Sequence, residues 1–113
     1  MTTYLLTAAG VSLALVTEDD RLPCVLHWGR DLGDADAADL ETLAAAERLP
    51  ILPNQVDGSL NYGVLLEARD GIMMRPGLIG SRDGADWTPD FRVERVLLDG
   101  APSLAQSPPV PRR

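Results

Sequence analysis

Two tryptophans and one arginine are the residues best suited by type and position to bind a ligand. Trp28 and Trp87 each flank a predicted turn, in a chain with only 4% aromatic residues. Indole rings stack on the apolar faces of sugars and also anchor protein interfaces. Arg75 lies in a loop rich in proline and glycine, where its guanidinium can donate hydrogen bonds to a carboxylate or to ligand hydroxyls. The three residues predict a saccharide- or protein-binding surface. The alternative is structural: the two indoles are partly buried, and the arginine pairs with an acidic side chain.

The residues that serve catalysis in other proteins are poorly placed in this one. His27 is the single histidine, which excludes a His pair or a His-rich metal site. Cys24 precedes it by three residues on a predicted strand, so we expect the two side chains on opposite faces and no nucleophile pair. Carboxylates lie mainly in turns and at a helix start, and no phosphate-binding glycine loop is present. We therefore predict no catalytic residues, no metal and no cofactor.

Length and composition indicate one domain with a modest core. The chain has 113 residues, of which 45% are hydrophobic and 24% charged. Its net charge of -7 and its scattered arginines argue against a nucleic-acid partner. Gly10 interrupts the first apolar run before it reaches membrane-spanning length, and the single cysteine cannot form an internal disulfide. We expect no membrane partner and a cytoplasmic location.

The elements that must position these residues are mostly strands. Tyr4 to Ala8 forms a short apolar segment, and Val11 to Leu15 alternates larger and smaller side chains as a half-buried strand does. Arg21 to Trp28 predicts a further strand, which the acidic turn Glu18 to Asp20 connects to the preceding one as an antiparallel hairpin. After Gly33 the pattern changes to that of a helix.

That helix is short. Asp34 and Asp36 are N-cap candidates, and apolar residues repeat on one face until Pro50 ends the segment. Two further strands are expected, at Leu60 to Glu67 and at Phe91 to Leu98, separated by an irregular region. Residues 1–100 then form a mainly β domain, and residues 101–113 a proline-rich tail that is expected to be disordered.

Two segments of this chain resemble one known family. Leu22 to Gly29, followed by Asp31 and Leu32, is similar to a strand in the N-terminal domain of bacterial α-galactosidases of glycoside hydrolase family 36. Arg75 to Phe91 resembles the actinobacterial pattern Gly-Arg-Pro-Gly-Leu-x-Gly-His-Arg-x-Gly-x-Asp-Trp-Ser-Pro-x-Phe. Met74 stands where that pattern has glycine, and Ser81 where it has histidine.

The resemblance implies an antiparallel β-sandwich, supersandwich-like and incomplete, with one short connecting helix. In the family the catalytic aspartates belong to a central barrel that is not matched here, so the chain alone is expected to be inactive. The loop around Arg75 would lend residues to a neighbouring active site. An α-galactoside would then bind only in the complete enzyme, and open apolar faces predict self-association. The alternative is a free-standing β-domain that binds a saccharide or a protein through Trp28, Arg75 and Trp87.

Overall fold

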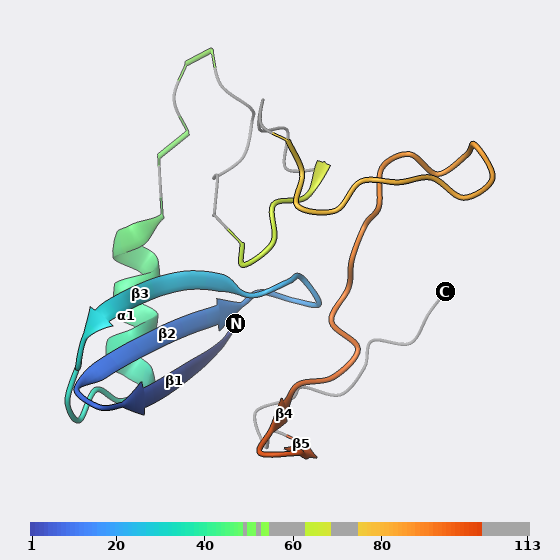
Figure 1. The fold of residues 1–113 in the computed structure, drawn as a ribbon. Coiled ribbons are helices and arrows are strands. Elements are labelled where there is room, and N and C mark those ends of the chain that lie inside the picture. Colours follow the sequence, from blue (N-terminus) through green and yellow to red (C-terminus); the bar gives the residue numbers. More distant parts are fainter. Residues whose placement is uncertain (49, 52, 55–62, 69–74, 103–113) are drawn as a thin grey trace.

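A three-stranded antiparallel sheet forms the ordered centre of the protein. The computed structural model describes all residues except 49, 52, 55–62, 69–74 and 103–113. The sheet has the order β1-β2-β3, with β1 at Thr2–Ala8, β2 at Val11–Thr17 and β3 at Cys24–Arg30. The order of the strands in the sheet therefore follows their order in the sequence (Figure 1).

The turns explain why these strands pair in this register. Ala9 and Gly10 connect β1 to β2 with φ angles of 49° and 77°, the positive values that a two-residue hairpin turn requires. This turn aligns Ala8 with Val11 and Thr2 with Thr17. The acidic turn between β2 and β3 has Asp19 at a φ of 53°. The predicted hairpin across Glu18 to Asp20 is confirmed.

One helix follows the sheet. α1 spans Ala37–Glu47 and begins at Asp36, whose side chain accepts a hydrogen bond from the Asp39 amide at 2.9 Å. Asp39 completes the capping box by accepting from the Asp36 amide at 3.1 Å. The helix ends at Arg48, which has an extended backbone. It lies across one face of the sheet, behind the strands in Figure 1, and contacts both β1 and β3.

Most of the core lies between this helix and the central strand; among the described residues, Tyr4 is a further buried apolar side chain, on the opposite face of the sheet. Ser12 and Ala14 have no exposed surface, and Val16 is also buried. Because these three residues alternate along β2, they share one face. Leu40 and Ala44, one turn apart on α1, are the buried residues of the helix. Two of the three buried residues on this face of β2, Ser12 and Ala14, have small side chains.

A β-bulge in β3 changes the prediction for Cys24 and His27. The register pairs Val16 with Cys24 and Ala14 with His27, with a shift between Ala14 and Leu15. Since Val16 and Ala14 share a face, Cys24 and His27 share it too, and the expected placement on opposite faces is wrong. The extra residue of the bulge reverses the strand's alternation at that point. His27 Nε2 lies 2.9 Å from the Arg30 carbonyl oxygen, within the same strand.

Beyond the helix, the described chain is mostly irregular. The strand expected at Leu60 to Glu67 is wrong for residues 63–67, where Gly63 forms only an isolated bridge with Cys24; residues 60–62 lie outside the described residues. The strand expected at Phe91 to Leu98 is reduced to β4, Leu97–Leu98, which pairs with β5, Ala101–Pro102. Within residues 91–96 the amide of Val93 bonds to Asp20, at the β2–β3 turn, instead of joining a strand ladder.

The predicted fold class is confirmed as mainly β and antiparallel, with a single short helix among the described residues. The sandwich is not confirmed. In the part of the chain that the structure describes, α1 covers one face of the three-stranded sheet, and the two-stranded β4–β5 hairpin is the other sheet. The tail expected at residues 101–113 includes β5, and its remainder lies outside the described residues.

Candidate functional site

Trp28 lies on the sheet face opposite the helix. The register aligns it with Leu13, which is aligned in turn with Leu6, so the three side chains form one row across the strands. Trp28 is 78% exposed and Leu6 is 46% exposed, while Leu13 is half-buried between them. Val11 and Val25 are also exposed on this side. We call these five residues the open sheet face.

Trp87 lies far from this sheet in the sequence, after a tight hairpin at residues 82–86. Arg82 and Ala85 exchange two backbone hydrogen bonds, at 2.8 and 2.9 Å. Gly84 has a φ of 81°, a conformation that an L side chain rarely adopts. The Trp87 indole nitrogen donates to the Gly84 carbonyl oxygen at 2.9 Å, yet the side chain remains 69% exposed. We call residues 82–87 the Trp87 hairpin; its backbone holds the indole in an exposed position.

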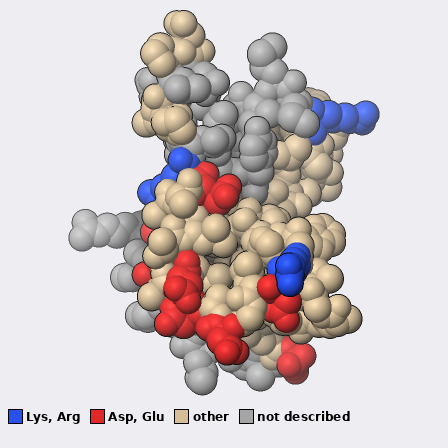
Figure 2. Space-filling model, turned by 90° about the vertical axis from the view of Figure 1, so that its left-hand side faces the viewer, with Lys and Arg blue, Asp and Glu red and all other residues tan. Residues whose placement is uncertain are grey.

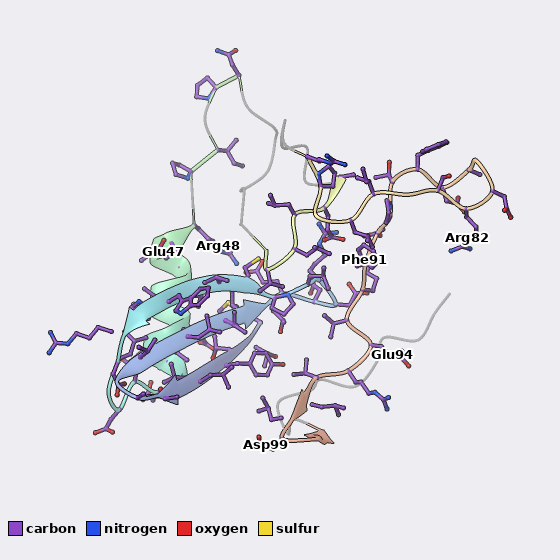
Figure 3. All side chains as sticks on the ribbon, viewed as in Figure 1. Glu47, Arg48, Arg82, Phe91, Glu94 and Asp99 are labelled. Atoms are coloured by element: carbon purple, nitrogen blue, oxygen red, sulfur yellow. The ribbon has the colours of Figure 1, made fainter. Side chains whose placement is uncertain are left out.

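The Trp87 hairpin projects from the rest of the molecule. Figure 3 labels Arg82 at its tip, at the opposite end of the structure from the helix terminus marked by Glu47 and Arg48. Arg82 and Asp86 form an ion pair of 3.9 Å in which both side chains are largely exposed. An exposed pair of this length contributes little to stability. The hairpin therefore presents a tryptophan and two charged groups to a ligand or a partner.

Arg75 begins the segment that leads to this hairpin, and it is exposed. Two residues later, the Gly77 amide donates to the Leu66 carbonyl oxygen at 2.9 Å. A Cβ atom at Gly77 would lie 2.5 Å from Leu65 Cδ1, so a larger residue at this position would require the Leu65 side chain to move. Backbone contacts thus hold the start of the loop, as its glycine and proline content predicts.

The structure does not gather the three predicted site residues into one surface. Trp28 belongs to the open sheet face, whereas Trp87 belongs to the projecting hairpin at the other end of the chain fold (Figure 1). None of the hydrogen bonds or ion pairs among the described residues joins Trp28, Arg75 and Trp87. A ligand that contacts Trp87 and a ligand that contacts Trp28 would therefore occupy separate sites.

An arginine outside the predicted site attaches the hairpin segment to the sheet. Arg92 donates to Asp20 at 2.6 Å and to Asp90 at 2.9 and 3.1 Å. The hydrogen bonds to Asp20 and then to Asp90 raise the pKa of Arg92 above its usual value, because they stabilise the charged guanidinium. Asp90 also lies 3.7 Å from Arg21, at the β2–β3 turn. The acidic turn between β2 and β3 is therefore exposed and is also a point of attachment for the hairpin segment.

Further contacts complete this attachment. The Val93 amide donates to the Asp20 carbonyl oxygen at 2.7 Å. Glu67 is buried, and its Oε1 accepts from the Phe91 amide at 3.0 Å. Glu18 forms an ion pair with Arg48 at the end of α1. The β2–β3 turn therefore connects the sheet to both the helix and the segment that carries the Trp87 hairpin.

The described side chains form no metal-binding cluster. Among them, no group of three His, Cys, Asp or Glu side chains is arranged to hold a metal ion. Several carboxylates are instead engaged by arginines or by the helix cap. Within the described residues, no helix has the length and apolar character needed to cross a membrane.

Comparison with known proteins returned no match. No protein-family model, no curated protein and no solved structure matches this sequence or its fold.

The sequence pattern missed two features of this region of the structure. Leu6 and Leu13 were not singled out, although the alternation of Val11, Leu13 and Leu15 does indicate one apolar face. Arg92 was also missed, because its partners at positions 20 and 90 are brought together by tertiary contacts. A surplus of acidic residues in one turn was the available signal for an arginine partner.

Proposed function

We propose that this chain is the N-terminal, non-catalytic part of an α-galactosidase of glycoside hydrolase family 36. In that enzyme it would serve assembly and would shape a galactoside site whose catalytic groups lie elsewhere. The observation that carries the proposal is the segment Arg75 to Phe91, which resembles the family pattern and includes the projecting Trp87 hairpin.

The hairpin has the properties needed to contribute to a neighbouring site. Its indole is exposed, while the bond to the Gly84 carbonyl oxygen limits the orientations of the ring. A ring that is already oriented loses less conformational entropy when a sugar stacks on it. Arg75 and Arg82 are exposed donors on the same segment and suit the hydroxyl groups of a galactoside.

The chain's own carboxylates support a non-catalytic role. Retaining hydrolysis needs two carboxyl groups about 5 Å apart that flank the scissile bond, one with a raised pKa. Here Asp20 and Asp90 are held by Arg92, and Asp36 and Asp39 cap a helix. The acid and the nucleophile would therefore come from the barrel of the complete enzyme.

A chimera tests the proposal. In it, this chain replaces the N-terminal segment of a full-length family member, and hydrolysis of a chromogenic α-galactoside is measured. We expect an active chimera and no turnover by the chain alone. Trp87→Ala in the chimera should lower kcat/KM about tenfold, the loss expected for one stacking contact of about 1.4 kcal/mol. Leu98→Ala, which removes another exposed apolar side chain, is the matched control and should leave kcat/KM unchanged.

Two results would contradict the proposal. One is a folded but inactive chimera, and the other is equal activity in the chimera and in its Trp87→Ala variant. If the chain alone binds a saccharide or a protein while the chimera stays inactive, the chain is a free-standing binding domain. Hydrolysis by the chain alone would overturn the non-catalytic role.

A further inference from the structure

We propose that Glu67 is a positioning residue that sets where the Trp87 hairpin lies. Among the described residues, Glu67 has the one buried carboxylate, with 8% of the residue exposed. Its Oε1 accepts a hydrogen bond at 3.0 Å from the amide of Phe91, which follows Trp87 by four residues. Burial of a carboxylate is unfavourable unless hydrogen bonds compensate for it, so a carboxylate at this point indicates a specific contact. Its part in galactoside binding rests on the function proposed above, whereas its part in placing the hairpin does not.

Residues 77–91 form a loop whose two ends bind to neighbouring residues. At one end, the Gly77 amide donates to the Leu66 carbonyl oxygen at 2.9 Å. At the other end, the Phe91 amide donates to the Glu67 carboxylate. Because consecutive Cα atoms are only about 3.8 Å apart, Leu66 and Glu67 bring the two ends of the loop together. Compact surface loops that are closed at the base in this way frequently carry function.

The residues that close this loop are attached to the sheet. The Val64 amide donates to the Pro23 carbonyl oxygen at 2.9 Å, just before β3 begins. Gly63 forms an isolated antiparallel bridge with Cys24, the first residue of β3. Backbone contacts therefore fix the segment that precedes Glu67 to one end of the sheet.

The Glu67 contact differs from the other attachments of the loop. The bond at the opposite end of the loop joins two backbone groups, so it does not depend on a side chain. The ion pair of Arg92 with Asp20 has both side chains about half exposed, where water and salt weaken it. The bond to Glu67 is assisted by charge and largely shielded from water, and bonds of this kind are the stronger ones. Glu67 is therefore the side chain on which closure of the loop depends most.

The distance between base and tip makes the hairpin sensitive to this contact. In Figure 3, Phe91 marks the base of the loop and Arg82 its tip, which extends away from the sheet. A small change of angle at the base therefore displaces the tip by a larger amount. Without the Glu67 carboxylate the hairpin should sample several directions, although its own bonds between Arg82 and Ala85 persist. An indole that samples several directions loses more conformational entropy when a ligand binds.

Hydrogen exchange of the chain alone, resolved by residue, tests the contact. Glu67→Met keeps an unbranched side chain of similar volume and removes the acceptor. It should accelerate exchange of the Phe91 amide at least about tenfold, the effect of losing one hydrogen bond to a charged group. Glu67→Gln should accelerate it less, because the amide oxygen still accepts. Glu94→Ala, at an exposed glutamate of the same segment, is the matched control and should leave it unchanged, while protection of the β2 amides shows that the sheet is folded.

Double electron–electron resonance between two spin labels tests the position of the hairpin. The labels are attached at Glu41→Cys on α1 and at Ser81→Cys beside the hairpin, both exposed positions, in a chain that carries Cys24→Ser. Glu67→Met should broaden the distribution of distances, Glu67→Gln should broaden it less, and Glu94→Ala should not change it. An unchanged Phe91 amide or an unchanged distance distribution in Glu67→Met would overturn the proposal.

The chimera tests whether this placement matters for a galactoside. Glu67→Met should lower kcat/KM by up to about tenfold, the loss expected for Trp87→Ala. It should have no further effect in a chimera that already carries Trp87→Ala, because residues that act through one another are not additive. Additive losses would overturn the role of Glu67 in presenting Trp87. An inactive chimera would contradict the proposed function alone, since the exchange and distance measurements do not use activity.

Discussion

The two faces of the three-stranded sheet differ in the size of their side chains and in what covers them. On the face that α1 covers, the central strand contributes Ser12 and Ala14, and neither has exposed surface. On the opposite face, the same strand contributes Val11 and Leu13, and Trp28 lies beside them on β3. Ser12 and Ala14 are therefore buried, whereas Val11 and Trp28 lie at the surface; on the same side as these two, Tyr4 is buried near the start of β1.

The central strand carries small residues on the covered face. Ser12 and Ala14 have no exposed surface, and Gly29, aligned with Ser12 on β3, adds no side chain there. Leu40 and Ala44 then fill the space from the helix side. The larger residues Val11 and Leu13 lie on the opposite face, where Val11 is exposed and Leu13 is half-buried. Figure 2 shows one face of the molecule with its acidic and basic side chains coloured.

The largest expected effect comes from the contact between the helix and the covered face. Leu40 is only 4% exposed. Leu40→Ala should lower the free energy of unfolding by about 3 kcal/mol, because it removes apolar contacts and leaves a cavity. Urea denaturation followed by circular dichroism measures this loss. Leu78→Ala, at an exposed leucine outside the sheet, is the matched control and should change it by less than about 0.5 kcal/mol.

A smaller effect is expected from the one hydroxyl group on the covered face of β2. Ser12 Oγ donates to Asp31 at 3.1 Å and accepts from the Leu32 amide at 3.1 Å. It also lies 3.0 Å from Thr7 Oγ1, so its hydrogen-bonding capacity is fully used. Ser12→Ala should lower the free energy of unfolding by about 2 kcal/mol, because the Leu32 amide loses its partner.

Hydrogen exchange provides a second measurement for this variant. The Leu32 amide lies in the connection between β3 and α1, and its exchange should accelerate in Ser12→Ala. Ser81→Ala, at an exposed serine, is the control. Unchanged stability together with unchanged exchange of the Leu32 amide would show that this network does not hold the helix to the sheet.

The three strands of the sheet and the helix α1 could be predicted because the sequence signals for them are local. Alternation between Val11 and Leu15 indicates a strand, and Asp36 with Asp39 marks the start of a helix. The face that becomes buried could not be predicted. Alternation alone favours burial of Val11, Leu13 and Leu15, whereas tertiary packing of α1 selects the smaller residues between them.

The segment from Phe91 to Leu98 was harder to predict, because its hydrogen-bond partners are distant in the sequence. Phe91 to Leu98 alternates as a strand does, but a strand also needs a neighbour with which to pair. The Phe91 and Val93 amides instead bond to Glu67 and Asp20, which no local pattern indicates.

The bulge in β3 that places Cys24 and His27 on one face of the sheet could not be predicted from the sequence either. The exposure of Trp28 and Trp87 agrees with a binding role, but their separation depends on the fold.

The smallest effects are expected on the open face, and one pair of neighbouring residues allows a direct comparison. Leu5 is aligned with Ala14 on the covered face, and Leu6 with Leu13 on the open face. Both leucines belong to β1, so the same substitution by threonine changes strand propensity equally at both positions. Leu5→Thr should lower the free energy of unfolding by about 1 kcal/mol, since Leu5 is half-buried.

Leu6→Thr should change that free energy by less than about 0.5 kcal/mol, because the side chain is already 46% exposed. Urea denaturation measures both changes. The difference between the two variants reports the contribution of α1 to the stability of the face that it covers. Equal losses from Leu5→Thr and Leu6→Thr would mean that Leu6 contributes as much to stability as Leu5, so that packing of α1 on one face does not distinguish the two positions.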